Sequence, residues 1–533
     1  MVNLRDAFRV HPDAMGHVPP KEVTNNRVIA LGMFGACAAI MYGYDLGFIG
    51  GVITLPAFLA DFDLTKAPAD YVTNFSSNVV SVFQAGAVGG ALISSPMANG
   101  LGRRWSIIIN LVIYTLGAAL MTGASGQAGV GLIYTGRLLT GWAVGASSMI
   151  TPVYVAECSP AHIRGRLVGL YEVGVQFGTM VGFWIPYAVL QTQKGTVQWR
   201  LPFALQLIPA VACIVAMWFL KESPRFTAKK FGQEKASHDL AYIRGLPEDH
   251  PYVRAELNSI MEQVAFEHAQ TASLEKFTAL RRTFGKANAR RLITGVLVMV
   301  FFQMAGTNAV NYYSPLIFQS FGLSSSSAKL FATGVYGVVR FVATLIAMVF
   351  FTDRFGRVQM LVWGGGAMAV FMWIIGALTH TFPPQAAGAA ISSAQLAAIV
   401  MIFLWAVSFC FSYAGIPWIY CAEIFPLDIR VFCMAICTAV HWLFNLMIAK
   451  SVPYMITNLV PGGLFFIFAA CTTVGSVLEY FFMPETKGRT LEEIEAAFEG
   501  KKVGRSTMAE RMQEKESHEF KERRESGDDK LEV

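Results

Sequence analysis

The sequence has few charged side chains. Only 15% of its 533 residues are Asp, Glu, Lys or Arg, and 54% are hydrophobic, whereas a soluble protein has roughly 25% charged residues. This composition excludes a water-soluble globular body, intrinsic disorder and a fibrous repeat. It predicts an all-α membrane protein, and the 48 glycines fit that class because small residues let helices pack closely in lipid.

Motifs of several catalytic and metal-binding classes are also lacking. The eight cysteines are scattered without a CxxC pair, so we interpret them as packing residues rather than a disulfide or metal framework. Neither an HExxH nor a Walker motif occurs, and no nucleophile–base set is convincing. We therefore expect no enzyme, no metal and no cofactor. The net charge of +6 comes from a few basic loops, which report on membrane topology rather than on nucleic acid.

Hydrophobic runs long enough to cross a bilayer recur along the chain. A hydrocarbon core needs about 20 apolar residues per helix, and this length predicts twelve spans. They lie at 28–50, 74–98, 105–125, 130–154, 168–190, 201–220, 292–315, 328–351, 358–379, 396–420, 432–456 and 462–483. The predicted organisation is an N-terminal segment 1–27, a six-helix bundle 28–220, a polar linker 221–291, a second six-helix bundle 292–483 and a polar tail 484–533.

The positions of Lys and Arg predict how the spans are oriented. Basic residues follow spans 2, 4, 6, 8 and 10, and the loops at the other end have few cations. Because cytoplasmic loops carry the excess of Lys and Arg, we expect both termini and the linker in the cytoplasm. The protein is then a multi-pass protein of the plasma membrane.

A charged pattern repeats in the two halves. Gly102-Arg103-Arg104 after span 2 is echoed by Asp353-Arg-Phe-Gly-Arg357 after span 8, and two Glu–Arg pairs with a seven-residue spacing follow spans 4 and 10. Ion pairs between these loops could lock one conformation and open in another; alternatively, the charges only anchor the topology. The candidate gating residues are Glu157, Arg164, Asp353, Arg357, Glu423 and Arg430.

Six motifs in this order resemble the sugar porter family of the major facilitator superfamily. They are Gly43-Tyr-Asp-Leu-Gly47, Gly136-Arg137, Lys221-Glu-Ser-Pro-Arg225, Gln303…Asn308-Ala-Val-Asn-Tyr-Tyr313, Pro417-Trp418…Glu423 and Pro484-Glu-Thr-Lys-Gly488. The resemblance covers roughly 25–490. It implies two six-helix bundles that rock about a binding site near the membrane midplane. Within the family, Ile133-Tyr-Thr-Gly-Arg137, Ile163–Glu172 and Asn311-Tyr-Tyr-Ser-Pro315 are similar to fungal quinate and sugar-acid permeases.

Two charges inside the membrane are candidates for proton coupling. Asp45 lies deep in span 1 and Arg137 early in span 4. The resemblance implies that the two side chains meet in space, and family members without the acid tend to be uniporters. Protonation of Asp45 would release Arg137 and alter helix packing. The alternative is a static buried ion pair.

Arg340 lies about halfway along span 8. A carrier of neutral sugars needs no cation at this position. A guanidinium matches the planar fork of a carboxylate, and the quinate permeases that this chain resembles have a basic residue here. Hexose carriers usually have two adjacent glutamines at the start of the span 7 motif, but the first is Phe302 here. Both features favour an anionic polyol, such as quinate or galacturonate. Arg340 could instead pair with an internal carboxylate such as Glu172.

The other candidate substrate residues are amides and one aromatic side chain. Hydroxyl-rich substrates need amide donors and acceptors and an aromatic face against their C–H surface. By resemblance, the substrate-contact positions are Gln176, Gln303, Asn308, Trp418 and Asn445.

We therefore predict a symporter that imports a monosaccharide or a polyhydroxy sugar acid with a proton by alternating access. The proton gradient drives transport. The alternatives are a neutral hexose or pentose carrier, a facilitator without proton coupling, and a nutrient sensor on the same fold. A sensor is disfavoured because such proteins tend to carry long tails, and only about 50 residues follow Pro484.

Overall fold

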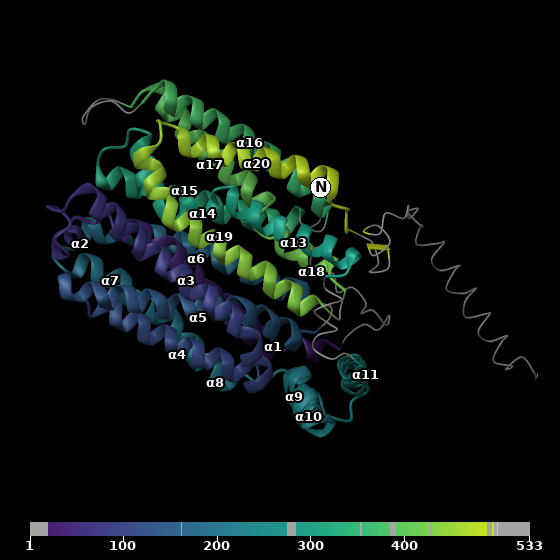
Figure 1. Ribbon diagram of the computed structural model, residues 1–533. Coiled ribbons are helices and arrows are strands. Elements are labelled where there is room, and N and C mark those ends of the chain that lie inside the picture. The colour runs from purple at the N-terminus through teal and green to yellow at the C-terminus, as the bar shows by residue number, and fades with distance from the viewer. Residues whose placement is uncertain are drawn as a thin grey trace, which may run out of the picture. The chain divides into compact units, whose positions relative to one another are not determined.

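The computed structural model describes residues 20–160, 163–273, 284–351, 354–383, 391–426, 429–487, 493–494 and 498. Twelve helical stretches within them are long and apolar enough to cross a membrane. This confirms the predicted all-α class and the number of spans (Figure 1).

Six spans form the first half of the chain. They are α1 (Asn26–Val52), α3 (Ala69–Leu101), α4 (Arg103–Thr122), α5 (Val130–Cys158), α6 (Arg164–Thr192) and the pair α7 (Val197–Leu205) and α8 (Leu207–Phe219); a short helix, α2 (Pro56–Asp61), follows α1. The second half contains the pair α13 (Lys286–Met304) and α14 (Thr307–Ser320), α15 (Ser326–Ile346), α16 (Arg357–Thr381), the pair α17 (Ser393–Phe411) and α18 (Ile416–Ile424), α19 (Arg430–Asn458) and α20 (Gly463–Phe482).

Among the described residues, most of the contact between the two halves is made by α3 with α19, α6 with α15, and α1 with α14. Figure 1 shows α3 running alongside α19. The contact of α1 with α14 needs a glycine, because a Cβ on Gly50 would lie 2.1 Å from the carbonyl oxygen of Tyr312. Small residues at such crossings let two backbones approach closely inside a membrane.

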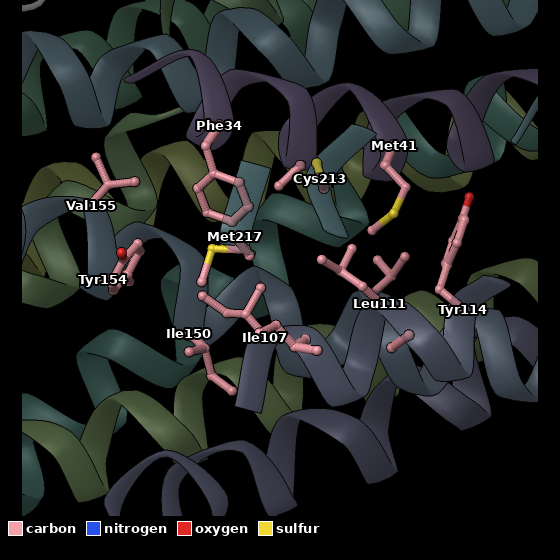
Figure 2. Close-up of a cluster of buried hydrophobic side chains, with 14 of the residues drawn as sticks. Phe34, Met41, Ile107, Leu111, Tyr114, Ile150, Tyr154, Val155, Cys213 and Met217 are labelled. Atoms are coloured by element: carbon pink, nitrogen blue, oxygen red, sulfur yellow. The ribbon is translucent and has the colours of Figure 1, made fainter. Parts of the chain in front are cut away.

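The core of the first half is aliphatic and aromatic. Figure 2 shows Phe34 and Met41 of α1 facing Ile107 and Leu111 of α4, with Met217 of α8 between them. These side chains are almost completely buried. Their packing holds α1, α4 and α8 together and so fixes the helix that carries Asp45.

Three of the described spans are interrupted, which hydropathy alone does not reveal. Span 6 is interrupted at Gln206, whose backbone angles remain helical. Span 10 divides between α17 and α18. Span 7 divides between α13 and α14 at Gly306, whose φ is +88°. Non-helical backbone inside a membrane is tolerated where it is buried in protein or lines a cavity. The break in span 7 separates Gln303 from Asn308, two of the predicted substrate residues.

Gly306→Ala is expected to destabilise the protein. An alanine in the left-handed region costs about 1–2 kcal/mol, and its Cβ would lie 3.1 Å from the ring of Phe468. The midpoint of thermal unfolding of the detergent-purified protein should therefore fall. The matched control is Gly366→Ala, because a Cβ there meets nothing within 4 Å. Equal midpoints for the two variants would contradict the assignment of strain to Gly306.

Three helices of the linker follow span 6: α9 (Pro224–Phe231), α10 (Gln233–Arg244) and α11 (Pro251–Ser273). Arg244 is fully buried and binds Glu256 through Nε and Nη2 at 2.8 and 2.6 Å. Its Nη1 donates to the carbonyl oxygen of Cys158 at 2.8 Å. Since Cys158 ends α5, the linker is fixed to that end of the first half, which we call the linker end.

Candidate substrate site and coupling pair

Asp45 and Arg137 form a buried ion pair. Arg137 Nη1 lies 2.9 Å from Asp45 Oδ1, and both side chains are fully buried. The hydroxyl of Tyr114 donates to Asp45 Oδ2 at 2.5 Å. Arg137 also donates from Nε to the carbonyl oxygen of Val79 at 3.2 Å and lies over the ring of Phe83. The pair thus joins α1, α3, α4 and α5, so that the charge on Asp45 influences the packing of four helices.

Arg340 lies where the two halves meet, and it is 4% exposed. Its Nε donates to Gln176 Oε1 of α6 at 3.2 Å. Its Nη1 donates to three oxygens, namely those of Thr307 at 3.1 Å, Asn311 at 2.5 Å and Tyr336 at 3.2 Å. Among the described residues, Nη2 makes none of these hydrogen bonds, and the Cys410 side chain lies close to the guanidinium. Arg340 therefore has one nitrogen left for a further acceptor.

Glu172 and Arg340 are linked through Gln176. The Gln176 Nε2 donates to Glu172 Oε1 at 2.9 Å, while its Oε1 accepts from Arg340. The internal carboxylate that was the alternative partner for Arg340 is thus nearby, but one amide lies between the two charges.

The amides of span 7 continue this network toward α19. Asn308 Nδ2 donates to Gln303 Oε1 at 2.8 Å, and Asn311 Nδ2 donates to Asn308 Oδ1 at 3.4 Å. Gln303 Nε2 lies 3.1 Å from His441 Nε2. A chain of polar groups therefore runs from Glu172 through Arg340 to His441 across the break in span 7.

Trp418 and Asn445 lie on the other side of this network. The ring of Trp418 is 5.0 Å from that of His441, centroid to centroid. Asn445 is fully buried, and neither polar atom of its side chain has a well-formed hydrogen bond among the described residues. Its neighbour Tyr312 lies close enough to Arg137 and Asp45 to experience both charges. Tyr312 thus stands between the coupling pair and the candidate substrate site.

Hydrogen bonds connect four of the six predicted substrate residues, namely Gln176, Gln303, Asn308 and Arg340. Trp418 adjoins this network through His441, and Asn445 lies beside Tyr312. The predicted set did not include Thr307, Asn311, Tyr336 or His441. His441 precedes Asn445 by one helical turn, and Tyr336 precedes Arg340 by one turn, so the i, i+4 spacing was the available signal.

The predicted gating charges pair within each half. Arg103 lies 3.0 Å from Glu157, which also accepts from Ser223 at 2.5 Å. Arg357 lies 3.3 Å from Glu423, which accepts from Thr486 at 2.5 Å. The repeat therefore includes more residues than the sequence pattern indicated. In each half, a hydroxyl group after the sixth span, on Ser223 or Thr486, donates to the glutamate.

The two arginines of the repeated Glu–Arg spacing do not bind those glutamates. Arg164 is exposed, and Arg430 donates to the carbonyl oxygen of Phe425 from Nε and Nη2 at 3.1 and 3.0 Å. Asp353 lies outside the described residues. Locking of the two halves by ion pairs between their loops stays a prediction.

A second glutamate in each half caps the helix that follows the repeat. Glu222 accepts from the backbone N–H groups of Arg103 and Arg104 at the start of α4. Glu485 accepts from those of Arg357 and Val358 at the start of α16. Carboxylates are favourable at a helix N-terminus. Burial nevertheless raises the pKa of Glu222, because the loss of water outweighs these hydrogen bonds.

At the end opposite the linker, Lys450 joins the two halves. Its Nζ donates to Asn74, Ser77 and Asn78 of α3 at 2.9, 3.1 and 2.5 Å. Asn74 also accepts from the hydroxyl of Tyr454. These bonds hold α19 against α3 at that end.

Residues 31–498 match the family described as "Sugar (and other) transporter". The quinate permease of Emericella nidulans is 38% identical over 488 residues, which cover 91% of each chain. A probable quinate permease of Aspergillus flavus is 38% identical over 502 residues, 93% of each chain. The inward-open xylose transporter XylE of E. coli superposes with a TM-score of 0.72 at 25% identity, covering 88% of this chain and 99% of that one.

The chain therefore belongs to the sugar porter family of the major facilitator superfamily. It is a multi-pass membrane transporter related to fungal quinate permeases and is not an enzyme. This confirms the family resemblance that the motifs carried.

Proposed function

We propose that the protein imports quinate, or a closely similar carboxylated polyol, together with a proton across the plasma membrane. The observation that carries the proposal is Arg340, a buried cation between the halves whose Nη2 takes no part in the hydrogen bonds that hold the other guanidinium nitrogens. A buried charge inside a membrane is costly and marks a functional site. A substrate carboxylate would supply the acceptor that Nη2 lacks.

The surroundings of Arg340 support an anionic substrate. Thr307 is the first residue of α14 and accepts from Arg340, so the amino end of that helix lies beside the guanidinium. The positive end of a broken helix favours a negative group on the substrate. The relatives are named quinate permeases, which narrows the proposal from sugar acids in general to quinate.

The amide side chains of the candidate site are suited to bind the hydroxyl groups of a polyol. Among the described residues, neither polar atom of the Asn445 side chain has a well-formed hydrogen bond, although Tyr312 lies beside it. A buried amide in this state is costly unless a ligand satisfies it. Trp418 offers a ring face next to His441. Hydroxyl groups of the substrate would bind Asn445, Gln303 and Asn308, while its C–H surface packs on Trp418.

Transport follows from the arrangement of the two halves. The pair of Asp45 and Arg137 lies in the first half, whereas most of the substrate network belongs to the second. Tyr312, at the crossing of α1 and α14, lies beside Asn445 and within electrostatic range of Asp45 and Arg137. Protonation of Asp45 loosens the first half, substrate binding draws the halves together, and the two halves rock with the linker end in the cytoplasm.

Uptake by a carrier-deficient yeast tests this function. Labelled quinate, galacturonate, xylose and glucose are compared at pH 5 and pH 7. We expect quinate to enter, faster at pH 5, and to accumulate above its external concentration. Xylose or glucose uptake without quinate uptake would overturn the assignment and favour the neutral carrier. That second candidate is supported by the amides of Gln303, Asn308 and Asn445, which suit any polyol.

A further inference from the structure

We infer that Glu172 is a second proton-binding residue of this carrier and that it must take up a proton for an anionic substrate to bind Arg340. The inference rests on the proposed function, because it concerns a carboxylate substrate at that guanidinium. It is separate from the pair of Asp45 and Arg137, which lies in the first half behind Tyr312. Glu172 is a buried titratable group for which the coupling mechanism has no use.

The network around Glu172 has a polarity that matches two opposite charges. The Gln176 amide presents its N–H to Glu172 and its oxygen to Arg340. This orientation satisfies a carboxylate at one end and a guanidinium at the other. The empty site is thus neutral, with one positive and one negative charge separated by one amide.

A substrate carboxylate would break that balance. It would bring a second negative charge to a site with one cation, inside a membrane where an uncompensated charge is strongly disfavoured. Both carboxylates would also lie within reach of the same guanidinium. Two carboxylates that share a site do not both stay ionised, and one of them takes up a proton. The substrate is held by Arg340 directly, so the proton goes to Glu172.

Glu172 has the geometry to accept that proton. The residue is half-buried, and Gln176 donates to Oε1. Oε2 makes no such hydrogen bond with the described residues. The proton would reach Oε2 through the exposed part of the residue and return to water when the substrate leaves. Gln176 can keep its hydrogen bond to Oε1 in both states, so the network need not rearrange.

Few other titratable groups of the described residues face Glu172. They are Tyr171 on its own helix, Tyr42 on α1, Arg340 on α15 and Cys410 on α17. The tyrosines and the cysteine stay neutral in the range between pH 5 and pH 8, and arginine stays charged. Glu172 is therefore the group in this cluster that would take up a proton when a substrate carboxylate arrives.

Equilibrium binding of quinate to the full-length purified protein tests the inference without requiring transport. Binding is measured by calorimetry at pH 5.5, 6.5 and 7.5 for wild type, Glu172→Gln and Glu172→Asp. If one proton is taken up on binding, the affinity of wild type for quinate falls by up to about tenfold for each unit by which the pH rises. We expect Glu172→Gln to bind as tightly at pH 7.5 as at pH 5.5, and Glu172→Asp to keep a pH dependence.

If the quinate affinity of Glu172→Gln changed with pH as steeply as that of wild type, the role of Glu172 would be refuted and the proposed function would stand. Wild type that binds xylose but no quinate at any pH would overturn the proposed function instead. A measurement on wild type alone guards against a misfolded variant. Quinate mixed with weakly buffered protein at pH 7.5 should take up about one proton per molecule bound, and no proton uptake would refute the inference.

Discussion

Arg340→Gln is expected to abolish high-affinity quinate uptake. A hydrogen bond to a charged group contributes about 1.5–3 kcal/mol, which corresponds to roughly 10- to 100-fold in affinity at about 1.4 kcal/mol per factor of ten. The KM for quinate should rise by that factor, because glutamine offers the carboxylate neither a positive charge nor a planar fork. Arg340→Lys should be intermediate, since it restores the charge without the fork. Initial rates of labelled uptake over a range of quinate concentrations measure the effect.

The controls separate a binding defect from a folding defect. Arg254→Gln replaces an exposed arginine of α11 and should transport like wild type. Arg340→Gln also leaves Glu172 without its cation, so surface expression and monodispersity in detergent are compared alongside. An Arg340→Gln protein that is well folded and takes up quinate with the wild-type KM would refute the carboxylate clamp. Arg340 would then be an internal partner of the Gln176–Glu172 pair.

The spans could be predicted because membrane insertion depends on a property that is local in sequence. Each membrane-spanning helix needs its own run of apolar residues, so each span can be predicted separately from the hydropathy of its own residues. The breaks in spans 6, 7 and 10 do not interrupt the apolar runs and were therefore missed. Their signal was local chemistry: Gly306 between Gln303 and Asn308, and Gly415 close before Pro417.

The site was only partly predictable for a related reason. The depth of Arg340 follows from counting residues along one helix, so its importance could be foreseen. Its partners could not, because Thr307, Asn311 and Gln176 become its neighbours only after α14, α15 and α6 pack. Glu172 and Gln176 lie on one helix, and their contact follows from the four-residue spacing. Interactions within one helix could be predicted from the sequence, whereas interactions between helices could be identified only from the structure.

The charged repeat shows the same limit at the linker end. Equal spacing suggested Glu157 with Arg164 and Glu423 with Arg430, yet both glutamates bind the arginine that follows an earlier span of the same half. The two arginines that begin α6 and α19 take no part in these pairs, and Arg430 binds the carbonyl oxygen of Phe425 instead. The repeat itself reflects two halves of like architecture, in which a glutamate at the end of the fourth span closes on the loop after the second.

Asp45→Asn is expected to remove one of the two protons that accompany quinate. Asparagine cannot take up and release a proton, although its carbonyl oxygen can still accept from Arg137. A difference of one pH unit is worth about 1.36 kcal/mol, so each coupled proton supports about tenfold accumulation per pH unit. Because Glu172 still takes up a proton with each bound quinate, the variant should concentrate quinate about tenfold less than wild type per pH unit. Proteoliposomes with an imposed pH difference measure the accumulation ratio, which should fall by that factor.

Counterflow distinguishes uncoupling from inactivation. Vesicles preloaded with unlabelled quinate should still draw in labelled quinate through Asp45→Asn, because exchange needs no net proton movement. Asp70→Asn, which changes an exposed carboxylate at the start of α3, is the matched control and should accumulate quinate like wild type. Accumulation that is as high in Asp45→Asn as in wild type but disappears in Glu172→Gln would move the coupling from the first half to the substrate site. Asp45 would then be a static partner of Arg137, and its ion pair would serve only to hold α1, α4 and α5 together.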